Sequence, residues 1–175
     1  MTTQPEPTIR GLWYEDFVIG EERVSPGRTV TEADIVMFAG VSGDTNPVHL
    51  DALFADQTPF KGRIAHGMLS ASFISTVLGT RLPGPGCIYL SQSLKFRAPV
   101  KAGDTVTARV TVKDVDIQTK RITVDTVCTV GDTVVIDGEA QLIVDRRADV
   151  AVASRDEASA KAGANGSGRR LDATR

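Results

Sequence analysis

Hydrophobic positions change their spacing about halfway along the chain. Up to residue 80 they recur at intervals of three and four, as on one face of a helix, and from residue 88 they alternate with polar residues, as in a strand. Prolines and glycines at 82–86 separate the two patterns. The sequence therefore predicts helices in the first part of the chain and a sheet in the second.

The first helix is expected over residues 31–39. Thr31 followed by Asp34 has the spacing of a capping box. The apolar residues that share one face of this helix are Ile35, Phe38 and Ala39. We expect Gly40 to end the helix and the turn-forming residues at 41–50 to make a loop.

A second, longer helix is expected over residues 66–80, which contain no Asp, Glu, Lys or Arg. Apolar side chains occur nearly all round its helical wheel, interrupted only by small hydroxyl residues. Such a helix in a chain of this size has to be enclosed by other elements. We therefore expect it to lie at the centre of the fold.

The strands follow one another with short links, which is typical of an antiparallel sheet. A Gly131-Asp132 hairpin turn is expected between the last two. The alternating segments lie at about 88–96, 106–112, 122–130 and 134–144. A sheet with one apolar face can curl around the enclosed helix, so the prediction is a single α+β domain in which an antiparallel β-sheet wraps around a long central helix.

Composition supports one domain with a tail. The chain has 175 residues, 41% of them hydrophobic, and its last part becomes rich in Ala, Ser, Gly and Arg. Such a segment cannot bury enough surface to offset the entropy of ordering it. We expect a domain at 1–146 and a flexible polar tail at 147–175, with a frayed helix near 150–162 as the alternative.

Charge and hydropathy exclude several partners. Twenty Lys and Arg stand against 22 Asp and Glu, without the basic excess of a protein that binds nucleic acid. No run of eighteen apolar residues predicts a membrane span, and the polar start has no signal-peptide pattern. The two cysteines, Cys87 and Cys128, form no CxxC pair. We expect a cytoplasmic protein with reduced thiols.

Asp44 and His49 are the first candidates for chemistry. They flank the Asn46-Pro47 turn, which can bring a carboxylate and an imidazole together to share acid and base duties near neutral pH. The alternative is that Asp44 caps the next turn and His49 is an incidental surface residue. The surrounding Gly-Asp-x-Asn-Pro-x-His context favours the pair.

His66 and Gly67 open the central helix, where free backbone N–H groups and the positive end of the dipole can hold an oxyanion. The alternative is a plain helix start with a glycine that allows packing, and both interpretations stay open. Ser72 could point its hydroxyl at the same site, although helical serines often bond their own backbone. Ser70 and Ser75 share this ambiguity.

Cofactor motifs are not found. The histidine and aspartate spacing matches no metal-ligand signature, and neither a Gly-x-Ser-x-Gly nor a Walker-type phosphate loop occurs. We therefore expect no metal and no organic cofactor.

Three segments together resemble the MaoC-like family of R-specific enoyl-CoA hydratases: Ser42-Gly-Asp-Thr-Asn-Pro-Val-His49, Ile64-Ala-His-Gly-Met-Leu69 and Ile88-Tyr-Leu-Ser-Gln-Ser-Leu-Lys-Phe96. The resemblance runs from about Trp13 to Asp145. It implies a hot-dog fold, in agreement with the architecture expected from the pattern of residues.

The resemblance also implies roles for residues. Asp44 and His49 would hold the water that adds to the double bond next to a thioester, and the amide of Gly67 would stabilise the thioester oxygen. Asn46 and His66 would lie beside this site, and Ser72 matches a serine that the family places there.

The substrate implied is a short trans-2-enoyl-CoA, with crotonyl-CoA and (R)-3-hydroxybutyryl-CoA as the simplest pair. Branched or dicarboxylic enoyl-CoAs such as mesaconyl-CoA are an alternative, as are an acyl-CoA thioesterase and a non-catalytic acyl-CoA-binding module. Polyhydroxyalkanoate supply, fatty acid metabolism and carbon assimilation would all be served by the same site. The resemblance further implies a homodimer in which the two sheets join edge to edge. Lys95 and Arg97, with Lys101, are the basic candidates for contacts with the CoA phosphates.

Overall fold

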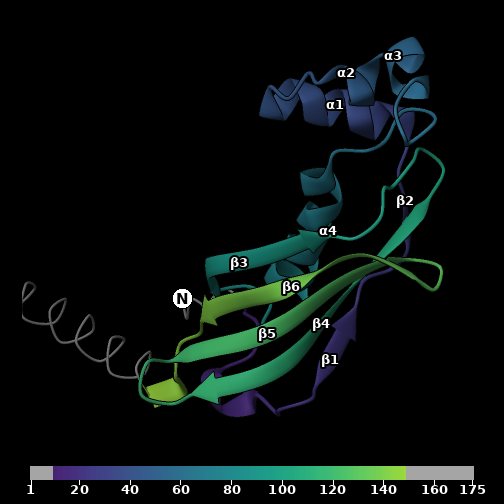
Figure 1. Cartoon of the computed structure of the whole chain (residues 1–175). Helices are drawn as coiled ribbons and strands as arrows, with labels where there is room; N and C mark the ends of the chain where they lie inside the picture. The colour runs from purple at the N-terminus through teal and green to yellow at the C-terminus, as the bar shows by residue number, and fades with distance from the viewer. Residues whose placement is uncertain (1–9, 149–175) are drawn as a thin grey trace, which may run out of the picture.

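Helix α4 lies against an antiparallel sheet in the computed structural model, which describes residues 10–148 (Figure 1). The elements, in chain order, are η1 (Tyr14–Asp16), β1 (Glu22–Val24), β2 (Arg28–Thr29), α1 (Glu32–Ser42), α2 (Pro47–Leu50), α3 (Ala52–Asp56), α4 (Gly67–Thr80), β3 (Ile88–Phe96), β4 (Thr105–Asp116), β5 (Arg121–Val130) and β6 (Thr133–Ile143). This is the predicted α+β architecture.

The sheet has six strands in the order β1-β4-β5-β6-β3, with β2 also paired to β4, and every pair is antiparallel. Val130 pairs with Thr133, so the turn between β5 and β6 consists of Gly131 and Asp132, as predicted. Gly131 has a positive φ of 54°, which a glycine adopts without steric cost. Strand β3 has β6 as its one neighbour and forms an edge of the sheet.

The core lies between α4 and strands β4 and β5. Alternate residues of the two strands are buried, as their period of two predicts. The buried apolar side chains of these strands are Val106, Ala108, Val110, Val112, Ile122, Val124 and Cys128. Burial raises the pKa of the Cys128 thiol to about 12, so this thiol is protonated at neutral pH.

Two strands depart from the expected alternation. In β6 the register shifts opposite Cys128 and Thr129, so Val135 is buried while Val134 is exposed, because a bulge inserts one extra residue. In β3 the expected apolar face is not covered: Ile88 is 58% and Phe96 55% exposed. Helix α4 packs mainly against β4 and β5, so among the described residues this face of β3 stays largely uncovered.

Helix α4 is covered on one side only. Leu69, Phe73, Ile74, Val77 and Leu78 are buried. The opposite side, with Met68, Ser72, Ser75, Thr76 and Gly79, is exposed. The prediction of an enclosed helix is therefore wrong for the single chain, since the sheet covers one face of α4.

Helix α1 is longer than predicted. Gly40 lies inside it, and the helix ends at Gly43, whose left-handed conformation and N–H bond to the Ala39 carbonyl form the cap. Its start agrees with the prediction, because Asp34 and Thr31 form the reciprocal capping box. The hydroxyl and amide of Thr31 lower the pKa of Asp34, with a smaller contribution from Arg28.

Helices α1, α2 and α3 lie together beyond the N-terminal end of α4, away from most of the sheet (Figure 1). At the other end of the domain, Arg147 binds the carboxylate of Asp16. The expected domain boundary at 146 stays a prediction, and most of the expected tail lies outside the described residues. None of the helices in residues 10–148 has the length and hydropathy that a bilayer span requires.

Candidate active site

A short loop, residues 43–46, carries Asp44 between α1 and α2. The predicted loop at 41–50 is thus confined to four residues, because α1 extends through Ser42 and α2 begins at Pro47. The backbone N–H of Asn46 donates to Oδ1 of Asp44 over 3.2 Å. The side-chain oxygen of Asn46 accepts from the backbone N–H of Val48 over 3.2 Å, which caps α2. Asn46 therefore shapes the turn and orients the carboxylate.

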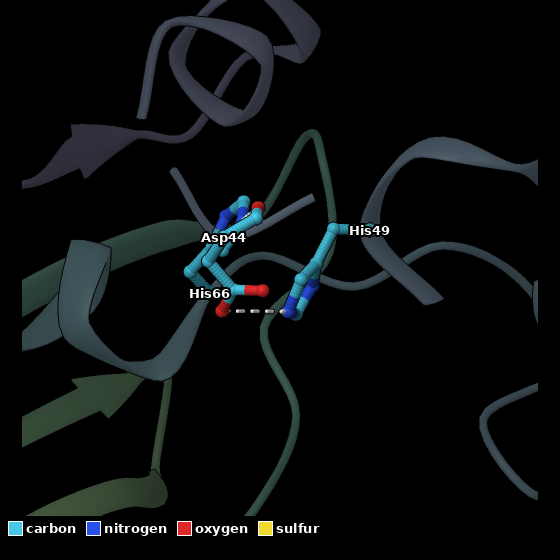
Figure 2. A group of neighbouring side chains, drawn as sticks. All are labelled: Asp44, His49 and His66. Atoms are coloured by element: carbon cyan, nitrogen blue, oxygen red, sulfur yellow. Dashed lines mark hydrogen bonds and ion pairs between the residues drawn. The ribbon is translucent and has the colours of Figure 1, made fainter. Parts of the chain in front are cut away.

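Asp44 and His49 face each other across this turn, as the sequence predicts (Figure 2). The distance from Asp44 Oδ2 to His49 Nε2 is 3.9 Å. His49 Nδ1 lies 2.8 Å from the carbonyl oxygen of Ile64. A carbonyl only accepts, so Nδ1 carries the proton and Nε2 of the neutral ring presents its lone pair towards Asp44.

His66 joins this pair from the start of α4. Its Nε2 lies 2.9 Å from the Asp44 backbone oxygen, and its ring stacks on that of His49 with 3.8 Å between ring centroids. His49 and His66 are both buried, whereas the Asp44 side chain is 53% exposed. The carboxylate therefore lies between solvent and two buried imidazoles.

A cavity of about 480 Å³ opens at these residues. It is lined by Asp44, His49 and Gly67, by Ser70, and by aromatic side chains that include Phe60 and Phe96. Gly67 begins α4, so its N–H has no partner within the helix. A Cβ at this position would lie 2.5 Å from Cε1 of Phe96, so only glycine fits here without displacing the aromatic ring.

Ser72 is not among the residues that line this cavity. It lies on a second cavity with Arg28 and Phe73, and its hydroxyl donates to the Leu69 carbonyl over 2.6 Å. Five residues separate it from Gly67, which at 3.6 residues per turn places it on another face of the helix. Ser70 lines the active-site cavity instead, and its buried hydroxyl has no partner among the described residues.

The two predicted CoA contacts differ in their surroundings. Arg97 lines the cavity, and its guanidinium donates to both carboxylate oxygens of Asp137, over 2.7 and 3.0 Å. This pair raises the pKa of Arg97 and lowers that of Asp137. Lys95 is exposed on β3 and is not among the residues that line the cavity.

Asp44, His49 and His66 have potential metal-ligand atoms within 4.8 Å of one another. The two imidazole rings are tilted by 31°, with their centroids 3.8 Å apart. One nitrogen of each ring bonds a backbone carbonyl, an arrangement that is also common for metal-ligating histidines. The expectation that this site holds no metal stays a prediction.

The aromatic lining was missed by the sequence analysis. Phe38, Phe60 and Phe96 come from α1, from the loop after α3 and from β3, and nothing in their local patterns distinguishes them from core residues. Phe96 ends the strand predicted at 88–96, but its place on the cavity beside Gly67 is a tertiary relationship.

A helix against an antiparallel sheet, with an Asp–His pair and a glycine at the start of that helix, defines a hot-dog protein of the hydratase type. The family model "MaoC like domain" matches residues 16–136. An (R)-specific enoyl-CoA hydratase from Rhodospirillum rubrum is 56% identical over 135 residues, which cover 77% of this chain and 93% of that protein. The chain belongs to the MaoC-like dehydratase family, as its motifs indicated.

Other relatives support the same family assignment. A 3-hydroxybutyryl-CoA dehydratase from Methylorubrum extorquens is 46% identical over 81% of this chain and 89% of its own length. Among solved structures, an R-hydratase from Pseudomonas aeruginosa has a TM-score of 0.73 and 40% identity, covering 79% of this chain and 89% of that one. The (R)-hydratase of A. caviae, described as involved in PHA biosynthesis, has a TM-score of 0.71 and 40% identity over 74% of this chain and 98% of its own. These matches confirm the predicted hot-dog fold.

Proposed function

We propose that the chain is an (R)-specific enoyl-CoA hydratase, a hydro-lyase that reversibly adds water to short trans-2-enoyl-CoA thioesters. The observation that carries this proposal is the 3.9 Å gap between Asp44 Oδ2 and His49 Nε2 at the cavity that also contains Gly67. The gap exceeds a direct hydrogen bond, and one water molecule can contact both atoms at normal distances.

The chemistry follows from these groups. A water held by the carboxylate and the bare imidazole nitrogen is oriented for attack on Cβ, and the proton that it loses passes to the pair. The same pair then supplies a proton to Cα, so the addition consumes one water and no net proton. The N–H of Gly67, at the positive end of α4, stabilises the enolate-like oxygen of the thioester.

The cavity supports a short acyl group. Its volume of about 480 Å³ has to hold the acyl chain and the start of the pantetheine arm, and Phe60 and Phe96 form part of its walls. The Methylorubrum relative is named for a four-carbon substrate. We take crotonyl-CoA and (R)-3-hydroxybutyryl-CoA as the substrate pair, and the cytoplasm as the location.

A homodimer joined through β3 is part of the proposal. This strand is an edge of the sheet and pairs on one side only among residues 10–148. Exposed edges invite pairing with another strand. Ile88, Leu90 and Phe96 on this strand, with Met68 of α4, are 41–58% exposed. Pairing of two β3 strands would cover part of this apolar surface and extend the sheet across both chains.

Two parallel assays with crotonyl-CoA test the function. One follows loss of the conjugated enoyl-thioester absorbance, and the other contains a thiol reagent. Loss of absorbance without thiol release, with the (R)-alcohol identified by chiral analysis, is the expected result. Thiol release would identify a thioesterase. Acyl-CoA binding without turnover of crotonyl-, branched or dicarboxylic enoyl-CoA would overturn the hydratase and indicate a binding module.

A further inference from the structure

The loop that carries Asp44 makes hydrogen bonds that are almost all local. The Gly43 amide donates to Ala39, the Asp44 amide to the hydroxyl of Ser42, and the Asn46 amide to the Asp44 side chain. These bonds connect residues no more than four positions apart. They define the shape of the loop but do not determine where it lies relative to α4.

His66 makes a hydrogen bond to this loop that is not local. Among the hydrogen bonds of the described residues, the contact between His66 Nε2 and the Asp44 carbonyl oxygen, 2.9 Å long, is the one that connects loop residues 43–46 to α4. The imidazole is only 2% exposed, and it also stacks on His49. A single buried side chain therefore contacts both members of the water-holding pair.

The hydrogen bond determines the tautomer of His66. The Asp44 carbonyl accepts, so Nε2 of His66 carries the proton and donates it. Nδ1 is buried and has no partner among the described residues. A proton at Nδ1 would be a buried donor without an acceptor, so the neutral Nε2–H form is the one that fits this environment.

A simpler structural role would be capping of α4, because His66 occupies its N-cap position. Its side chain, however, makes no capping bond to the first turn. The side chain turns to the Asp44 loop, while the backbone of the same residue leads directly into Gly67. His66 thus connects the water-holding pair to the amide that receives the thioester oxygen.

We propose that His66 is a positioning residue that keeps the Asp44–His49 pair in register with the Gly67 amide. The inference rests on the proposed hydratase function. The water has to meet Cβ while the carbonyl oxygen, three bonds away from Cβ, lies on the Gly67 amide. An error of about 1 Å between these positions can cost roughly a hundredfold in rate. Without the Nε2–H bond, loop residues 43–46 would lose their hydrogen bond to the start of α4. The position of the Asp44–His49 pair relative to the Gly67 amide would then vary more.

Two substitutions test the N–H donor and the aromatic ring of His66 separately. His66→Gln retains an N–H donor without the aromatic ring, and His66→Phe retains a ring without the donor. Hydration of crotonyl-CoA gives kcat and KM. The Kd of butyryl-CoA, which is saturated and cannot react, reports thioester binding without the hydration step. Exposed Gly79→Ala, near the other end of α4, is the control for a general effect on this helix.

We expect His66→Phe to lower kcat by at least about tenfold with the butyryl-CoA Kd within about twofold of wild type, and His66→Gln to recover part of kcat. The proposal is overturned if His66→Phe retains its kcat, if Gln is no better than Phe, or if the Kd weakens as much as kcat falls. Wild-type turnover in the same assay tests the hydratase function separately.

A measurement on the unmodified protein keeps the inference testable if the variants do not fold. Nitrogen-15 NMR correlated to the imidazole carbon-bound protons distinguishes the two neutral tautomers. The Nε2–H tautomer for His66, with a slowly exchanging proton, is the expected result. An Nδ1–H tautomer would show that His66 does not donate a hydrogen bond to Asp44, and it would overturn the proposal.

Discussion

His49 Nε2 faces Asp44 Oδ2 across 3.9 Å, a gap that fits one water molecule in contact with both atoms. The bond from His49 Nδ1 to Ile64 leaves Nε2 as an acceptor. In the proposed hydration, this pair accepts one proton from the water and returns one proton to Cα.

Asp44→Asn should reduce kcat for crotonyl-CoA by at least about a hundredfold, because the amide removes a charged acceptor from the water. His49→Gln should act similarly. The double variant should lose little more than either single one, since both residues act on one water. Steady-state kinetics with circular dichroism as a folding control measure this, and losses that multiply independently would contradict a shared water.

Gly67→Ala should lower kcat by about tenfold or more, because its Cβ would collide with Phe96 and displace the amide from the thioester oxygen. Gly79→Ala, in the same helix with no atom within 4 Å of its Cβ position, is the matched control. Adding Phe96→Ala to Gly67→Ala should restore part of kcat by removing the collision. No recovery in this double variant would argue against the steric explanation.

Arg97→Ala should raise KM for crotonyl-CoA by roughly three- to tenfold if its guanidinium contacts the CoA phosphates. KM for the crotonyl thioester of N-acetylcysteamine, which lacks phosphates, should not change. Lys95→Ala is tested alongside it. Lys113→Ala removes the same charge from a lysine that already pairs with Glu139 and Asp125, and it serves as the control. Equal changes in KM for both thioesters would show that Arg97 does not contact the CoA phosphates.

Leu90→Lys should weaken the proposed dimer, because it places a charge on the exposed edge of β3. Light scattering after size-exclusion chromatography should show twice the chain mass for the wild type and a concentration-dependent shift towards one chain mass for the variant. Ile117→Lys, at another exposed apolar position outside β3, should remain dimeric. A monomeric wild type would contradict the edge-to-edge assembly.

Asp34→Asn should destabilise the fold at pH 7. The folded pKa of Asp34 is lowered below its ordinary value of 3.8, chiefly by Thr31, so its carboxylate contributes stability above that pH and loses it as the pH falls through the folded pKa. Urea unfolding should therefore show a lower midpoint for the variant at pH 7 and a smaller difference from wild type below pH 3.8. A difference that is constant with pH would exclude the charged capping box as its cause.

Much of the fold could be predicted from local patterns. Period-two alternation located β4 and β5, and the capping box at Thr31 and Asp34 located the start of α1. The end of α1 was predicted three residues too early, because a glycine inside a helix costs only about 1 kcal/mol and the left-handed cap at Gly43 provides the actual end.

The sequence by itself identified Asp44, His49 and Gly67 as the candidate site residues, from their spacing and motifs, and each of them lines the same cavity. The tertiary structure decided the rest. Whether Ser70 or Ser72 faces that cavity depends on how α4 is rotated against the sheet, and the contact of His66 with Asp44 spans 22 positions along the chain. Spacing along a chain encodes only local geometry, so these relationships arise when α4 packs against the sheet.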